Sequence, residues 1–242
     1  MLKSPTEATV LVFGMDGNVL DNYSIKAECA GRALVENAQK YFNKGESQEF
    51  FSNIYIETSG KNSLEQIRIA YEQIGVKDIP REILEQTEQD FRSYLDDAQE
   101  EVRMFPEVEL FLKRNSNRYI FTITTTVPII DMDSIDKNAG LSSFFQIICA
   151  RHGYLEKGIL NNVPGFDKGP QHYNLLLKKF LIPKQGLIAI SSTKQDIVNA
   201  KQFGIKSIAV EHIFTAAELK IYEPDNIVHD FSELDALLEV MS

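Results

Sequence analysis

The sequence predicts a doubly wound, mainly parallel α/β sheet with an inserted α-helical domain, and three observations support this prediction. Short apolar runs without polar alternation recur along the chain, which is typical of parallel strands covered on both faces. Amphipathic segments lie between the later runs, so strand, helix and strand follow one another with right-handed crossovers. About a hundred residues separate the first run from the second, far more than one crossover helix needs.

The first expected strand is the apolar run ATVLVF, and the later runs are similarly apolar. Gly204 follows the last expected crossover helix, where it favours a helix end. The expected strands are Ala8–Phe13, Arg118–Thr124, Phe145–Ala150, Gly186–Ile190, Lys206–Val210 and Ile227–His229. The expected helices between the later strands are Val108–Lys113, Pro170–Phe180 and Thr193–Phe203.

The long interval after the first strand is charged and mostly helical in pattern. We expect residues 23–103 to form an inserted helical cap, and residues 1–22 and 104–242 to form the core. Within the insert, SLEQIRIAYEQI has helical spacing, with Ser63 as its candidate N-cap and Gly75 as its stop.

The composition is that of a soluble globular protein, with 43% hydrophobic and 25% charged residues. No apolar run is long enough to span a bilayer, and Met1–Thr9 is too short and polar for a signal peptide. The two cysteines, Cys29 and Cys149, suggest a buried thiol rather than a disulfide or a metal site. We therefore expect a cytoplasmic protein.

A formal net charge of −10 argues against nucleic acid and anionic membranes as partners. The same charge repels phosphate esters at long range. An anion site therefore needs local donors, such as a lysine or a helix N-terminus.

Polar residues follow the ends of two expected strands. Asp16-Gly17 comes directly after the first strand, at the edge where open α/β sheets place ligands, although Asp-Gly is also a common turn. Thr124 begins a run of three threonines at the end of the second strand. Hydroxyl and backbone N–H groups there can hold a phosphate, but β-branched residues are also common in strands.

Two further segments place charge at helix starts. Lys168 stands just before Gly169-Pro170, which puts an ammonium beside a helix N-terminus, although an isolated lysine is more often a solvated surface residue. Asp196 lies near the start of a later helix, where capping alone would explain a carboxylate.

Taken together, these segments resemble the four motifs of the haloacid dehalogenase (HAD) superfamily, over nearly the whole chain. The matching stretches read VLVFGMDGN, YIFTIT, DKGP and LIAISSTKQD. The insert after the first motif resembles the helical cap of the branch that contains phosphoglycolate phosphatase and β-phosphoglucomutase. The resemblance implies a HAD Rossmann-like core.

The resemblance also implies roles for single residues. The position of the catalytic nucleophile is Gly14, and Asp16 is the acid/base candidate. Thr124, Thr125 and Lys168 are the candidates for phosphate binding. Because glycine has no side chain, no covalent aspartyl-phosphate can form at position 14.

The family uses Mg²⁺, and the resemblance implies ligands for it. They would be the nucleophile, the backbone of Asp16 and the aspartate of a Gly-Asp pair, with Asp196 as a supporting acid. Here the Gly-Asp pair is replaced by Ser191-Ser192, so a neutral hydroxyl of Ser192 stands where Mg²⁺ prefers a carboxylate. With Gly14 at the other position, we expect Mg²⁺ binding to be weak or absent.

These motif losses predict a non-catalytic protein that binds phosphate or a small phosphorylated metabolite, or that has a regulatory role, with little or no enzymatic activity. One alternative is a weak, atypical phosphohydrolase in which Asp16 activates water. Another is a protein-interaction module, so a protein partner is left open. Lys61, in a polar loop of the insert, is a candidate for ligand selectivity, although a solvated loop lysine is the simpler interpretation.

Overall fold

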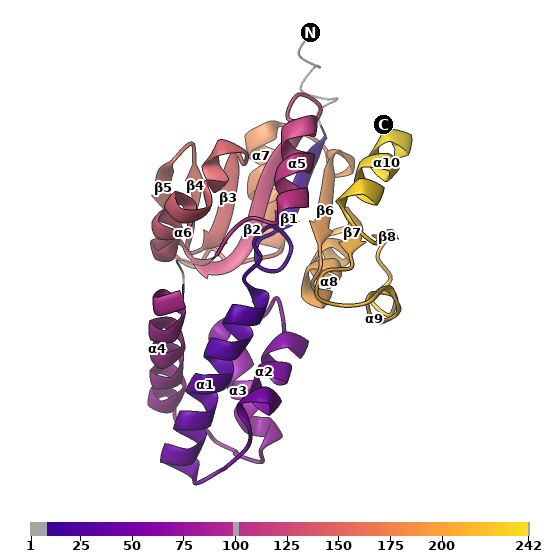
Figure 1. The fold of residues 1–242 in the computed structure, drawn as a ribbon. Helices are drawn as coiled ribbons and strands as arrows, with labels where there is room; N and C mark the ends of the chain where they lie inside the picture. The colour runs from indigo at the N-terminus through magenta and orange to yellow at the C-terminus, as the bar shows by residue number, and fades with distance from the viewer. Residues whose placement is uncertain (1–8, 99–101, 242) are drawn as a thin grey trace. The chain divides into compact units, whose positions relative to one another are not determined.

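The computed structural model describes residues 9–98 and 102–241 and divides into two compact units (Figure 1). Unit 1 contains the described parts of residues 1–21 and 103–242, and unit 2 contains those of residues 22–102. Each of the two boundaries between the units therefore lies one residue before the one expected from the sequence. Ala8, the expected start of the first strand, lies outside the described residues.

Unit 1 is built on an eight-stranded sheet with the order β5-β4-β3-β2-β1-β6-β7-β8 in the described chain. Along the run β3-β2-β1-β6-β7-β8, each strand is parallel to the next. The sheet is mainly parallel, as predicted, and the first strand lies in its interior between β2 and β6. The strands are β1 Val10–Gly14, β2 Ile120–Pro128, β3 Ile147–Arg151, β4 Gly153–Glu156, β5 Ile159–Asn162, β6 Leu187–Ser191, β7 Lys206–Val210 and β8 Asn226–Val228.

Helices connect these strands and cover both faces of the sheet (Figure 1). The expected helix Pro170–Phe180 has these same bounds in the structure. The helices of unit 1 are α5 Pro106–Asn115, α6 Met132–Ala139, α7 Pro170–Phe180, α8 Lys194–Phe203, α9 Ala216–Lys220 and α10 Phe231–Met241, with 3-10 turns η3 Ile129–Asp131, η4 Leu141–Ser143 and η5 Lys184–Gly186.

Two features of the sheet differ from the expectation. Strands β4 and β5 form an antiparallel hairpin at one edge, which the search for buried apolar runs missed. Strand β2 continues to Pro128, so Thr124 does not end it; the pairing with β3 shifts register after Thr124 instead.

Unit 2 is helical in its described part. It contains α1 Tyr23–Phe42, α2 Gln48–Glu57, α3 Ser63–Gln73 and α4 Arg81–Ala98. The N-cap of α3 is Asn62, whose side chain accepts a hydrogen bond from the Glu65 amide, so the expectation of Ser63 was wrong by one residue. Gly31 allows α1 and α2 to approach closely, because a Cβ there would lie 2.7 Å from the Gln48 carbonyl oxygen.

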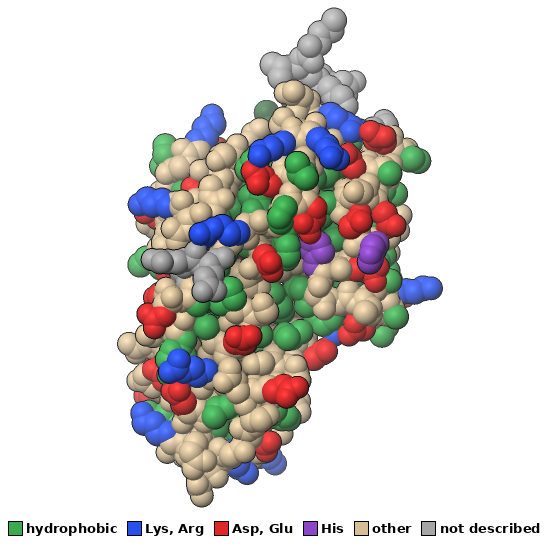
Figure 2. Space-filling model, in the orientation of Figure 1, with side chains coloured by type: hydrophobic (Ala, Val, Ile, Leu, Met, Phe, Trp, Pro, Cys, Tyr) green, Lys and Arg blue, Asp and Glu red, His purple; other side chains and the backbone are tan. Residues whose placement is uncertain are grey.

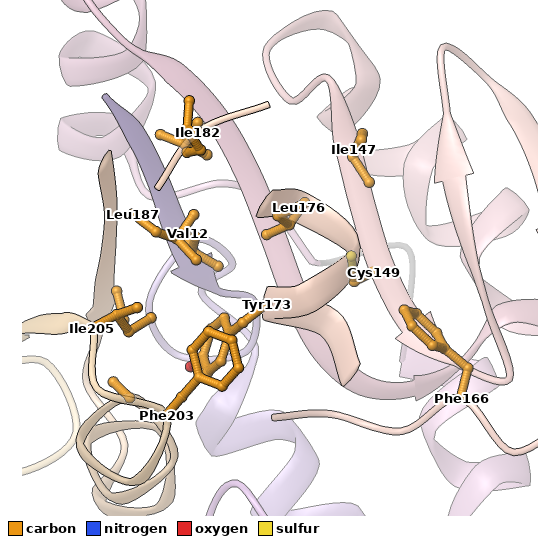
Figure 3. Close-up of a cluster of buried hydrophobic side chains, with 13 residues drawn as sticks. Val12, Ile147, Cys149, Phe166, Tyr173, Leu176, Ile182, Leu187, Phe203 and Ile205 are labelled. Atoms are coloured by element: carbon orange, nitrogen blue, oxygen red, sulfur yellow. The ribbon is translucent and has the colours of Figure 1, made fainter. Parts of the chain in front are cut away.

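The central strand β1 sends alternate side chains to opposite faces of the sheet, as the two-residue period of a strand requires. Val10 and Val12 pack in a cluster with residues of α7 and α8. Figure 3 shows this cluster, in which Tyr173 of α7 and Phe203 of α8 lie close together, with ring centroids 5.2 Å apart.

Phe13 points to the other face and contacts four aromatic rings. Its ring centroid lies 5.7–6.3 Å from those of Phe111 of α5, Phe121 of β2, Phe145 and Phe231 of α10. Phe13 is fully buried. The aromatic cluster around it joins β1 to α5, to β2 and to the last helix, α10.

The surface in Figure 2 shows acidic and basic side chains interspersed, with no continuous basic patch on this face. Among the described residues, no helix is long and apolar enough to cross a membrane.

We expect Phe13→Ala to lower the free energy of unfolding by about 3–5 kcal/mol, because it leaves a cavity among four rings. Urea denaturation followed by circular dichroism measures the change. Ile130→Ala is the matched control: Ile130 is 79% exposed, so we expect a change within about 0.5 kcal/mol. Equal losses for the two variants would contradict the packing described here.

Candidate functional site

Several of the predicted site residues lie at the carboxyl ends of β1 and β6 and beside Thr124 in the middle of β2. Gly14, the last residue of β1, is paired with Thr124 of β2. On its other side Phe13 is paired with Ile190 of β6, so Ser191 lies beside Gly14. By the alternation of the strand, Gly14 faces the same side as Val12, toward α7 and α8.

The space in front of Gly14 is filled by two polar side chains. A Cβ on Gly14 would lie 2.8 Å from Ser191 Oγ and 2.9 Å from Asp196 Oδ2, closer than Cβ atoms normally approach other atoms. Gly14 does not have a positive φ, so its backbone conformation does not require glycine. Ser191 and Asp196 therefore occupy the volume into which a side chain at position 14 would project.

Asp196 is held by a buried ion pair. Lys168 Nζ lies 2.6 Å from Asp196 Oδ1, and the two side chains are only 9% and 4% exposed. Ser191 Oγ donates a hydrogen bond of 2.7 Å to the other carboxylate oxygen, Oδ2. The backbone places Asp196 in the first turn of α8, where Thr193 is the N-cap and accepts from the Asp196 amide. Both oxygens of this carboxylate thus face donors from within the chain.

Ser192 and Asn18 fasten the loop after β1. Ser192 Oγ donates to the Gly17 carbonyl at 2.7 Å. The Asn18 amide donates to the carbonyls of Gly14 and Ile190, at 3.3 and 3.1 Å. Since both side chains are fully buried, they tie the Asp-Gly loop to the end of β6.

The two threonines proposed to bind phosphate do not face the same side. Thr124 is paired with Gly14 and shares its face, whereas Thr125, the next residue of the strand, points to the other. Thr125 Oγ1 also accepts a hydrogen bond from the Val127 amide. The structure therefore brings Thr124, but not Thr125, to the face of Gly14.

The two remaining candidates, Asp16 and Lys61, are more exposed than the residues around Gly14. Asp16 follows β1 and is partly exposed. Lys61 belongs to unit 2, in the loop before α3, where its ammonium lies 2.8 Å from Glu65 Oε1.

His172, for which the sequence indicates no role, lies fully buried in the first turn of α7. Its ring packs against that of Phe166, with centroids 4.5 Å apart and ring planes tilted by 31°. Burial and, second, the Lys168 cation lower the pKa of His172 to about 3. The nearby Ala150 backbone opposes this shift, but neither ring nitrogen has a partner with hydrogen-bond geometry. His172 has no metal-ligand spacing to other residues, and the only signal in the sequence is its position four residues after Lys168.

The sequence profile of haloacid dehalogenase-like hydrolases matches residues 11–210, which is most of the chain. The chain belongs to this family. Solved structures agree with the HAD fold. A HAD-like hydrolase of Streptococcus pneumoniae superposes with a TM-score of 0.72 at 20% identity, covering 96% of this chain and 98% of that one.

Two further HAD structures are similar to this chain. A predicted phosphoglycolate phosphatase of Haemophilus somnus has a TM-score of 0.71 at 15% identity, covering 99% and 100% of the two chains. A candidate β-phosphoglucomutase of Thermotoga maritima has a TM-score of 0.62 at 18% identity, covering 96% and 99%. Likeness at these identities establishes the fold alone. No curated protein sequence matches the chain.

HAD proteins generally use Mg²⁺, but the donors present in this HAD-like chain do not fit that ion. Gly14 offers no side chain, and Ser192 offers a neutral hydroxyl that already donates to Gly17. Asp196 is engaged by Lys168 and Ser191. Within residues 9–98 and 102–241, no three His, Cys, Asp or Glu side chains are grouped so that they could hold a metal.

We expect His172 to make the protein less stable as the pH falls below about 6.5. The unfolded chain takes up a proton near that pH, whereas the folded chain does so only near the lowered pKa of about 3. The contribution of neutral His172 to the free energy of unfolding is therefore complete above pH 6.5. It falls progressively toward pH 3, by up to about 1.4 kcal/mol per pH unit.

The measurement is the free energy of unfolding of the native protein and of His172→Phe between pH 6.5 and 4.5. The phenyl ring keeps the contact with Phe166, so the variant should fold and show a shallower dependence. His212, whose pKa burial also lowers, is present in both proteins, and the difference therefore isolates His172. Equal slopes would show that His172 is protonated in the folded protein at mild pH.

Proposed function

We propose that this HAD-like protein is a non-hydrolysing member of its family that binds the phosphate group of a small metabolite, or an inorganic anion, at the ends of β1, β2 and β6. The observation that carries the proposal is the filled space before Gly14, where Ser191 and Asp196 stand in place of a nucleophile. In this proposal unit 2 is the helical cap, and Lys61 is its candidate for selectivity.

Two losses argue against hydrolysis. A glycine cannot form a covalent phosphoryl intermediate, and removal of the nucleophile from one hydrolase lowered turnover by about 10⁶. The Ser192 hydroxyl is neutral and is committed to the Gly17 carbonyl, so the position of a metal-binding carboxylate serves to hold the loop. Without a nucleophile or a metal cage, the family's reaction has neither of its two main components.

Other features support anion binding. Lys168 lies two residues before Pro170, the first residue of α7, and the positive dipole end of that helix favours negative charge. Thr124 shares the face of Gly14. Loss of carboxylates at positions 14 and 192 also removes charge that would repel a phosphate in the absence of a metal.

We expect the native protein to release no phosphate from sugar phosphates or an aryl phosphate, with or without Mg²⁺, because it lacks the nucleophile. Inorganic phosphate should nevertheless raise its stability, by about 2.7 kcal/mol at about 100 times the Kd, since only the folded state binds. Malachite-green detection of phosphate and thermal unfolding measure the two effects.

The exposed pair Lys137–Asp133 supplies a matched control. Lys137→Met should keep the stabilisation by phosphate, and Lys168→Met should lose it. Turnover by the native chain that disappears in Asp16→Ala would instead support an atypical hydrolase. The absence of any phosphate effect would favour an interaction module.

We expect restoration of the nucleophile to require a change at Ser191 as well. The double variant Gly14→Asp with Ser192→Asp would restore both carboxylates, but the new Cβ at position 14 would lie 2.8 Å from Ser191 Oγ. Overpacking of this kind costs about 1–3 kcal/mol. The triple variant with Ser191→Gly relieves the overlap with Ser191, the closer of the two neighbours. It should show Mg²⁺-dependent phosphate release above the native protein and the double variant.

The control for this experiment is the same triple variant with Gly14→Asn, which has the same shape but no nucleophilic carboxylate. Activity equal to that of the aspartate variant would rule out the intended covalent mechanism. A double variant as active and as stable as the triple one would show that Ser191 is no obstacle.

A further inference from the structure

The Asp196 carboxylate is placed as a bound anion would be. Its Oδ1 lies 2.6 Å from the Lys168 ammonium, and its Oδ2 accepts the Ser191 hydroxyl at 2.7 Å. Lys168 and Asp196 are both almost fully buried. The cation on which the anion site depends is therefore neutralised by the protein's own carboxylate.

The absence of a side chain at Gly14 makes this arrangement possible. Asp196 Oδ2 lies 2.9 Å from the point that a residue-14 Cβ would occupy. A nucleophile at position 14 would compete with Asp196 for that volume. With glycine present, Asp196 can turn toward Lys168 while Ser191 fills the remaining space.

We propose that Asp196 is a built-in occupant of the anion site and determines its specificity: an external anion binds Lys168 only by displacing this carboxylate. The inference rests on the proposed anion-binding function and adds to it an internal competitor for the site. The site selects phosphate and phosphomonoester dianions over monoanionic carboxylates.

The physical reason is competition with an intramolecular ligand. A tethered group acts at an effective concentration that is in the millimolar range or above, so a free carboxylate of the same chemistry gains nothing by replacing it. A phosphate dianion carries twice the charge and three terminal oxygens, and it forms stronger charge-assisted hydrogen bonds with an ammonium and a helix N-terminus. Only such a ligand can offset the loss of the internal pair.

The test is isothermal titration of the native protein and of Asp196→Asn with inorganic phosphate and with acetate. Removal of the internal carboxylate should raise the affinity for phosphate by about tenfold or more, because a like charge in contact with the site is lost. It should also make acetate binding measurable. Asp133→Asn removes the same charge from the exposed Lys137 pair and should leave both affinities at native values.

A second measurement covers the case in which Asp196→Asn folds poorly, since it leaves Lys168 buried without a counter-ion. Phosphate should raise the Tm of Asp196→Asn by more than it raises that of the native protein. The double variant Lys168→Met with Asp196→Asn has no buried charge to compensate, so it should fold and show no phosphate effect.

The outcomes separate this inference from the proposed function. Native binding of phosphate with no gain in Asp196→Asn, in affinity or in Tm shift, would refute the internal occupant and leave the anion site standing. Phosphate binding by the double variant at native affinity would refute any role for Lys168. A lack of phosphate binding by both the native protein and Asp196→Asn would overturn the proposed function and this inference together.

Discussion

The two-residue period of β1 is the constraint on which the site depends. Because the strand is buried on both faces, each of its side chains is committed to one layer of helices. Phe13 fixes the register through its four aromatic neighbours, and position 14 must then point toward α7 and α8. The same rule places Ser191 beside Gly14 and separates Thr124 from Thr125. The packing of the core thus decides which polar groups can meet at the sheet edge.

Charge neutralisation inside the protein is the second determinant. A buried lysine is costly unless a partner compensates it, and Asp196 is that partner for Lys168. The pair sits among other groups that burial keeps uncharged: the pKa of His172 is lowered, and that of Tyr173 is raised by burial and then by the charge of Asp196. These four buried groups therefore contribute little net charge, although the protein as a whole carries a formal net charge of −10.

Much of the fold could be predicted because it depends on local patterns. The unbroken apolar runs located the parallel strands to within a few residues, and Pro170 with Lys168 marked the start of α7. The β4–β5 hairpin escaped because β5 is an exposed edge strand, so Ile159 and Leu160 have no buried pattern to reveal them.

The site was predictable only in part. The family resemblance implies that carboxylates are missing at positions 14 and 192, an inference that requires only the order of residue types along the chain. The resemblance could not show what fills the space, because the approach of Ser191 and Asp196 to Gly14 joins segments about 180 residues apart and depends on the packing of α8. The opposite directions of Thr124 and Thr125 likewise required the continuation of β2 to Pro128, which its polar residues concealed.

The close approach of Gly14 and Ser191 also has a consequence for the evolution of the chain. The family pattern has an aspartate at the position of Gly14 and a glycine at the position of Ser191. This chain has the small residue at position 14 and the larger one at position 191, so each substitution makes room for the other. An aspartate arriving at position 14 would overlap Ser191, and a glycine arriving at position 191 would remove a hydrogen bond from Asp196. Either single step back is disfavoured until the other has been taken. Each substitution therefore disfavours reversal of the other, and a lineage that has acquired both would be expected to keep both.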